Sequence, residues 1–176
     1  TEYWKEAGCE PDILVTAKSI AAGLPLSAVV TREEIMEAVP AGTIGGTYCG
    51  NALSCAAALK TIELMEKNHL AERAQEIGKK VMDRYEKMKE KYEPVGDVRG
   101  LGAMIGMEFV KDKKTKEPDP QFVKDLVQEC VQHGLMIESA GVYGNVIRFL
   151  APLVITDEQL EAGLDILENA VGKLTV

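Results

Sequence analysis

Two kinds of hydrophobic spacing follow one another along the chain. Near its start, β-branched runs at residues 13–16 and 26–30 flank the turn signal Gly23-Leu24-Pro25, which predicts two buried strands. Farther on, apolar residues recur at steps of three and four, which predicts helices at residues 52–67, 70–91, 120–133 and 157–171. Short apolar runs between these helices predict one or two strands within residues 98–110 and one each at residues 135–138 and 146–150.

Each predicted helix has an apolar or small-residue face that we expect to be buried. In chain order these faces are Ala52, Cys55, Ala56, Ala58 and Leu59; Leu70, Ala74, Ile77, Val81, Tyr85 and Met88; Val123, Leu126, Val127, Cys130 and Val131; and Leu160, Leu164, Leu167 and Val171.

Polar residues mark the expected helix starts. Thr31 and Thr156 each precede a Glu or Gln by three residues, which is the capping-box spacing and predicts a helix directly after each threonine. Asn51 and Asp119 are expected to be single caps, the latter followed by Pro120 at the first helical position.

The predicted elements run strand, strand, helix, long helix, and then β-α-β-β-α. This order predicts an α/β protein in which residues 1–69 form part of the sheet of a large domain and residues 70–176 form a small α+β domain. Two strands cannot complete an open α/β layer, and the chain begins at Thr1 rather than Met. We therefore expect further sequence upstream that supplies the remaining strands.

Composition narrows the classes of function. The 176 residues are 46% hydrophobic and 27% charged, as in globular domains. A formal net charge of −8 disfavours binding to nucleic acid. The longest weakly charged run, residues 13–30, is interrupted by Lys18, Gly23 and Pro25, so no membrane span is expected. Four unpaired cysteines and two histidines predict neither a metal site nor a disulfide scaffold, and favour a cytoplasmic protein with reduced thiols.

Lys18 is the first candidate for chemistry. It is the only charged side chain between residues 13 and 30, and it follows a predicted strand, where α/β proteins place their ligand-binding ends. A lysine amine removed from water favours its neutral form, a nucleophile that can form a Schiff base with a carbonyl compound. A lysine with a buried stem and its amine in water fits the same position. The position alone leaves both interpretations open.

Two further groups could bind anions. The turn Gly45-Gly46-Thr47 precedes a predicted helix and offers backbone amides and a hydroxyl to a phosphate, although glycine-rich turns are often only structural. Arg148 stands alone in an apolar run, where a buried guanidinium needs an acceptor. A substrate carboxylate would serve as that acceptor, and so would Glu108 or Glu138 in a structural ion pair.

An amine for a Schiff base, a phosphate cradle and a carboxylate-binding arginine are together what a pyridoxal phosphate enzyme acting on amino acids requires. The segment EPDILVTAKSIAAGLPLSA, from Glu10 to Ala28, closely resembles the cofactor-lysine signature of the class III, or omega-amino-acid, aminotransferases. The turn from Gly45 to Asn51 resembles their phosphate-contacting turn, and residues 142–160 are most similar to the 4-aminobutyrate aminotransferase branch.

The resemblance implies the C-terminal portion of a fold type I transferase with pyridoxal 5'-phosphate as cofactor. Lys18 would hold the cofactor as a Schiff base and then move the proton between the substrate carbon and the cofactor. Gly46 and Thr47 would bind a cofactor phosphate, Thr47 that of the neighbouring subunit, which implies a homodimer. Arg148 would pair with the carboxylate of glutamate or 2-oxoglutarate.

The activity implied by the resemblance is transfer of the amino group of 4-aminobutyrate to 2-oxoglutarate, giving succinate semialdehyde and glutamate. The upstream half would supply the rest of the site, so the chain alone is expected to be inactive. Another class III donor, such as ornithine, acetylornithine or a further omega-amino acid or amine, is the nearest alternative. A non-catalytic oligomerisation fragment is another, in which Lys18 and Arg148 are merely structural.

Overall fold

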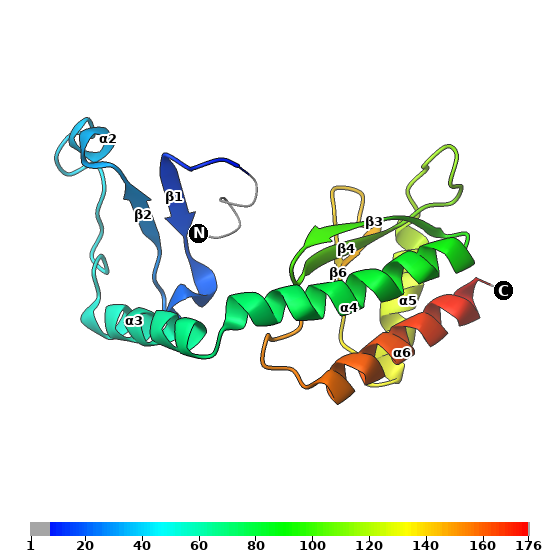
Figure 1. Cartoon of the computed structure of the whole chain (residues 1–176). Helices are drawn as coiled ribbons and strands as arrows, with labels where there is room; N and C mark the ends of the chain where they lie inside the picture. Colours follow the sequence, from blue (N-terminus) through cyan, green and yellow to red (C-terminus); the bar gives the residue numbers. More distant parts are fainter. Residues whose placement is uncertain (1–7, 176) are drawn as a thin grey trace. The chain divides into compact units, whose positions relative to one another are not determined.

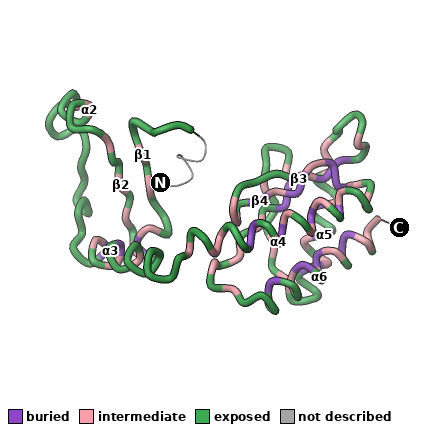
Figure 2. Tube along the Cα trace, in the orientation of Figure 1, coloured by how far each residue is buried: buried purple, intermediate pink, exposed green. Residues whose placement is uncertain are grey.

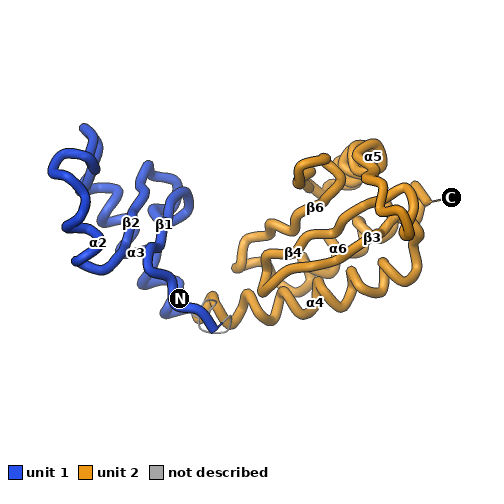
Figure 3. Tube along the Cα trace, turned by 90° about the horizontal axis from the view of Figure 1, so that it is seen from above, with its two compact units in different colours: residues 1–68 blue, residues 69–176 orange. Residues whose placement is uncertain are grey.

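The computed structural model describes residues 8–175, and its contacts divide the chain into two compact units (Figure 3). Unit 1 comprises Thr1–Asn68 and unit 2 comprises His69–Val176. This division lies one residue before the domain boundary expected between residues 69 and 70. The two units are described separately below.

Unit 1 pairs two short strands and adds helices after them (Figure 1). Its elements are β1 (Ile13–Thr16), the 3-10 helix η1 (Lys18–Ala21), β2 (Ala28–Thr31), α2 (Glu33–Glu37) and α3 (Ala52–Lys67). The strands are antiparallel, with Ile13 opposite Thr31 and Thr16 opposite Ala28. The second strand begins two residues later than the sequence pattern indicated, because Gly23, Pro25 and Ser27 extend the preceding turn.

The prediction that both strands are buried is wrong for the described part of unit 1. No residue of either strand is buried (Figure 2). Exposed and half-buried residues alternate along β1, whereas Val29 and Val30 of β2 are both exposed. The sheet of this unit has two strands, and a two-stranded sheet is too narrow to enclose a core of its own. Residues 8–68 alone therefore leave these β-branched side chains without a core to pack into.

Two expectations about local structure in unit 1 are also wrong. Thr31 does not cap α2, because it is the last residue of β2 and its hydroxyl donates to the carbonyl oxygen of Asp12 at 2.8 Å. Of the face predicted for α3, only Ala58 is buried and Cys55 is half-buried, whereas Ala52, Ala56 and Leu59 are exposed. Ser54, which was not part of that face, is buried. The Asn51 cap is confirmed, since its Oδ1 accepts from the backbone amide of Ser54 at 3.1 Å.

Unit 2 contains a four-stranded antiparallel sheet and three helices. Its elements are α4 (Leu70–Lys91), β3 (Val95–Leu101), β4 (Met104–Phe109), α5 (Pro120–Gln132), β5 (Glu138–Ala140), β6 (Val146–Arg148) and α6 (Asp157–Leu174). The strand order is β3-β4-β6-β5. The α+β arrangement predicted for this part of the chain is confirmed, and α4 has the predicted bounds.

The core of unit 2 lies between the helices and one face of the sheet. Along β4, Ile105, Met107 and Phe109 are buried, and they pack with Ile147 of β6 and the apolar stripes of the helices. The predicted stripe of α6 is fully confirmed. On α5 the prediction is wrong for Val131, which is exposed although the neighbouring Cys130 is buried.

Helix starts in unit 2 follow the predicted caps. Asp119 accepts from the amide of Phe122 at 3.0 Å, and Thr156 and Gln159 exchange both hydrogen bonds of a capping box, each 3.2 Å long. The strand expected at residues 135–138 is instead β5, which starts at Glu138. The residues before it continue the turn that begins at Gly134, whose φ of 84° favours glycine.

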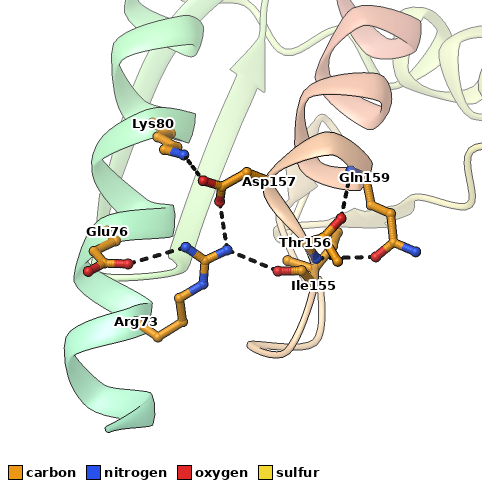
Figure 4. Close-up of polar contacts among 7 residues, drawn as sticks. All are labelled: Arg73, Glu76, Lys80, Ile155, Thr156, Asp157 and Gln159. Atoms are coloured by element: carbon orange, nitrogen blue, oxygen red, sulfur yellow. Dashed lines mark hydrogen bonds and ion pairs between the residues drawn. The ribbon is translucent and has the colours of Figure 1, made fainter. Parts of the chain in front are cut away.

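Charged side chains join α4 to the start of α6 (Figure 4). Arg73 Nη2 donates to the carbonyl oxygen of Ile155 at 2.9 Å and to Asp157 Oδ1 at 2.8 Å. Lys80 donates to the other oxygen of Asp157 at 2.6 Å. These two cations lower the pKa of the Asp157 carboxyl, Lys80 making the larger contribution. The cluster holds the segment between β6 and α6 against α4.

We expect Asp157→Asn to lower the stability of the chain at neutral pH. A carboxyl whose pKa is lowered in the folded state stabilises that state above its unfolded pKa, about 3.9, and loses this contribution as the pH falls through the folded pKa. The difference in urea midpoint between the variant and the wild-type chain should therefore be clear at pH 7 and shrink below about pH 4. Asp125→Asn, whose partner is the neutral amide of Gln121, is the control. A difference that persists unchanged at pH 3 would contradict this role.

One close backbone contact fixes α4 against the sheet. A Cβ built on Gly78 would lie 2.1 Å from the carbonyl oxygen of Gly102, in the turn between β3 and β4. No side chain fits there, because the obstructing atom belongs to the backbone and cannot rotate away.

Gly78→Ala should therefore destabilise the chain by about 2 kcal/mol, as forced overpacking does, despite the better helix propensity of alanine. Gly163→Ala on α6 is the matched control, since its new methyl would meet Leu135 Cδ1 at an ordinary 3.5 Å. It should be neutral or stabilise by up to about 1 kcal/mol. Urea unfolding of both variants checks the prediction, and equal effects would disprove the close approach.

Candidate functional site

Lys18 begins η1, two residues after β1 ends. Its φ is 57°, in the left-handed region that side chains other than glycine rarely adopt. The preceding Ala17 is extended, with φ −158°. This sharp change of direction presents Lys18 at a shallow, open hollow, which is lined by Lys18, Ser19, Gly23, Leu24, Pro25 and Leu26.

Lys18 is exposed, so the expectation of a buried amine is wrong for the described residues. Within residues 8–175 its amine takes part in no hydrogen bond or ion pair, whereas Arg32 in the same unit pairs with Asp12 and Glu34. An exposed amine without a partner in the described chain is accessible to an approaching aldehyde.

The glycine-rich turn is exposed from residue 41 to residue 50. A Cβ built on Gly45 or Gly46 would meet nothing within 4 Å, so these backbone amides are open to an approaching group. Within the described chain, the amides of Gly46 and Thr47 donate no hydrogen bond, while Cys49 donates to the carbonyl oxygen of Gly46 at 2.9 Å. The turn therefore offers amides and the Thr47 hydroxyl just before the N-terminus of α3.

Small buried residues form the contact between η1, which begins with Lys18, and α3, which follows Thr47 in the chain. η1 and α3 pack against one another, and their buried residues are Ala21, Ser54 and Ala58. Such small side chains allow close approach of the two helices. Unit 1 thus contains both the candidate amine and the candidate phosphate-binding turn.

Arg148 lies in unit 2, on the face of the sheet opposite the core. The register places Arg99, Gly106, Arg148 and Glu138 in one row across β3, β4, β6 and β5. Directly opposite residues of an antiparallel sheet share a face, so these side chains project from the same side. The side chain of Arg148 is 46% exposed, which corrects the expectation that it is buried. On β6 only Ile147 packs into the core, whereas Val146 is buried on the same face of the sheet as Arg148.

The two acidic residues considered as partners of Arg148 behave differently. Glu138 Oε2 lies 3.6 Å from Arg148 Nη2, a loose and exposed ion pair. Glu108 instead lies 2.7 Å from Arg99 Nη1, which also pairs with Asp97 at 2.7 Å. The hydrogen bonds that Arg99 donates to Asp97 and, with a smaller effect, to Glu108 raise the pKa of Arg99. Sequence reasoning missed Arg99, although its two-residue spacing from Asp97 on a strand was a signal that both share the polar face.

Other kinds of site find no support in the part of the chain that is described. Within residues 8–175, no group of three His, Cys, Asp or Glu side chains is arranged to hold a metal ion. No helix in the same range is both long and apolar enough to cross a bilayer. Burial raises the pKa of the Cys130 thiol to about 11, so this thiol is unreactive near neutral pH.

The candidate residues thus form two groups with distinct chemistry. Unit 1 offers an amine for a carbonyl carbon and a turn for a phosphate, and unit 2 offers a guanidinium for a carboxylate. The sequence profile of the aminotransferase class-III family matches residues 1–171, and the chain belongs to this family.

Relatives with known names support this assignment. The chain is 47% identical over 158 residues to a probable 4-aminobutyrate aminotransferase of Bacillus subtilis, and 39% identical over 170 residues to a 5-aminovalerate aminotransferase of Pseudomonas aeruginosa. These alignments cover 90% and 97% of the chain, but only 36% and 40% of the two relatives. The structure matches a Bacillus anthracis aminotransferase with a TM-score of 0.88 and 33% identity, over 97% of this chain and 40% of that one. The predicted family and fold are confirmed, for a chain that spans well under half of its relatives' length.

The left-handed backbone at Lys18 can be tested without any ligand. Lys18→Gly should be more stable than Lys18→Ala by about 1 kcal/mol, because only glycine adopts this φ without steric cost. At the extended residue Ala17, glycine should instead destabilise by roughly 0.5 kcal/mol, since it only adds freedom to the unfolded chain. Amide hydrogen exchange of residues 13–31 in each variant gives the difference. A Lys18→Ala chain as stable as Lys18→Gly would refute the strained conformation.

Proposed function

We propose that the chain is the part of a class III aminotransferase that carries the reactive lysine and the carboxylate-binding arginine, and that the complete enzyme transfers the amino group of 4-aminobutyrate to 2-oxoglutarate. The products are succinate semialdehyde and glutamate. The observation that carries the proposal is the 47% identity over 158 residues to a probable 4-aminobutyrate aminotransferase. Because the chain spans 36% of that relative, activity is expected of the complete protein and not of this chain alone.

The family implies pyridoxal 5'-phosphate as cofactor, and the residues present fit it. Lys18 supplies an unpartnered primary amine for the aldehyde, and Gly46 and Thr47 supply open amides and a hydroxyl for the phosphate. When bound, this cofactor withdraws electrons from the substrate carbon that bears the amino group.

Lys18 would act twice in the reaction. Its Nζ would hold the cofactor, and as a free amine the same atom would accept and return the proton of the substrate carbon. The strained backbone of Lys18 supports this role, since such strain is found where a side chain must be held in one direction.

The anion-binding groups would orient the two substrates and the cofactor. Thr47 Oγ1 and the adjoining amides would donate hydrogen bonds to a phosphate, in the proposed homodimer to the one held by the neighbouring subunit. The planar guanidinium of Arg148 would bind the substrate carboxylate through two parallel hydrogen bonds, replacing the loose contact with Glu138. The remaining site would come from the part of the complete protein upstream of this chain, and we place that protein in the cytoplasm.

A second donor has a specific observation in its favour. The 5-aminovalerate aminotransferase matches over 97% of this chain, and its named donor is one methylene longer than 4-aminobutyrate. A difference of one methylene changes binding by only about 1–3 kcal/mol in an apolar pocket. The choice between the two donors therefore depends on residues outside this chain as well as on Arg148.

The decisive experiment uses the complete protein loaded with cofactor and a panel of amino donors. We expect 4-aminobutyrate to give the highest kcat/KM, above 5-aminovalerate, ornithine and acetylornithine. Borohydride reduction followed by peptide mapping should place the pyridoxyl mass on Lys18, and Lys18→Ala should lose both this label and at least about a thousandfold in rate. Lys60→Ala on α3 is the control for removing an exposed lysine. A label on another lysine, or a better donor than 4-aminobutyrate, would reject the respective part of the proposal.

A further inference from the structure

The open face of the sheet in unit 2 carries more charge than Arg148 alone. Arg99 and Arg148 occupy the same row, separated by Gly106 on β4, which has no side chain to place between them. With adjacent strands about 4.8 Å apart, the two arginine Cα atoms are about 10 Å apart. A Cβ on Gly106 would lie 3.3 Å from Val146 Cγ1, a tight contact, and within 4 Å of no other atom beyond its chain neighbours, so only Val146 lies close to this position.

Glu108 is placed between these two arginines. It follows Gly106 by two residues, and so it lies on the same face and is a diagonal neighbour of both Arg99 and Arg148. Diagonal neighbours in a sheet are about 7–8 Å apart, within reach of long side chains. From this position a carboxylate can pair with either guanidinium.

In the structure, Glu108 pairs with Arg99 and not with Arg148. Its Oε2 lies 2.7 Å from Arg99 Nη1, and no ion pair joins it to Arg148 in the described chain. Its side chain is only 26% exposed, so a Glu108 without Arg99 would be a half-buried carboxylate that needs another cation. Arg148 is the other cation in diagonal reach.

We propose that Arg99 is a positioning residue for the substrate carboxylate, because by holding Glu108 it keeps the guanidinium of Arg148 open. This inference rests on the proposed role of Arg148. Asp97 assists by accepting from Arg99 Nη1 at 2.7 Å, which fixes the side chain of Arg99 along β3. Without Arg99, the Glu108 carboxylate would form an ion pair with Arg148 and compete with the substrate carboxylate for its guanidinium.

The test measures kcat and KM for 2-oxoglutarate in the complete, cofactor-loaded enzyme. Arg99→Gln should raise KM about tenfold and change kcat by less than about twofold. In this variant Glu108 would compete with 2-oxoglutarate for Arg148 in the free enzyme, which weakens substrate binding and leaves the later steps unchanged. The double variant Arg99→Gln/Glu108→Gln should return KM to near the wild-type value, since the competing charge is gone. Arg99→Lys, which keeps the cation, should stay near wild type.

Three variants separate the explanations. Arg84→Gln, which removes an arginine that pairs with carboxylates of α6, is the matched control and should leave KM unchanged. Arg99→Met keeps the aliphatic stem and should repeat the effect of Arg99→Gln if the latter does not fold. Arg148→Gln should raise KM more than either. If Arg148→Gln leaves KM unchanged, the proposed function of Arg148 fails and the inference fails with it. If Arg148→Gln raises KM but Arg99→Gln does not, or if the double variant gives no rescue, only the role of Arg99 is overturned.

Discussion

Side-chain alternation along the antiparallel strands of unit 2 is the constraint on which the rest of this unit depends. Odd positions of β4, such as Ile105 and Met107, face the helices, so even positions, such as Gly106 and Glu108, must face the other way. A shift of one residue in the pairing would bury the charged row and expose the core. The same register that encloses the hydrophobic core therefore also places Arg148 on the open face.

Much of unit 2 could be predicted from the sequence, because its signals are local and agree with its packing. The 3.6-residue period gave α4 its observed bounds, and the Thr156 capping box forms as its spacing indicates. The partners of Arg148 could not be predicted in the same way. Both Glu108 and Glu138 were available, and the choice depends on cross-strand register and on Arg99, which has a sequence separation of nine residues from Glu108.

Unit 1 shows where local signals and the described structure disagree. Its two strands and the helices α2 and α3 were predicted, but the 3-10 helix η1 was not. The burial predicted for residues 13–16 and 26–30 is not found, because a two-stranded sheet does not provide it within residues 8–68. Thr31 fits the capping-box spacing, but it is the last residue of β2, where it pairs with Ile13 of β1. The N-cap of α2 is therefore Arg32. The left-handed backbone at Lys18 had no signal at all, as lysine is not a residue that favours it.

Two sets of contacts hold α4 within unit 2. They are the close approach of Gly78 to Gly102 and the hydrogen bonds from Arg73 to Ile155 and Asp157. One fastens α4 to the turn that starts β4, and the other fastens α4 to the segment that follows β6. The first contact reaches Arg148 through β4, which pairs with β6, and the second reaches it through the segment that directly follows β6. The orientation of the Arg148 guanidinium is therefore linked to that of α4 by two separate routes within unit 2.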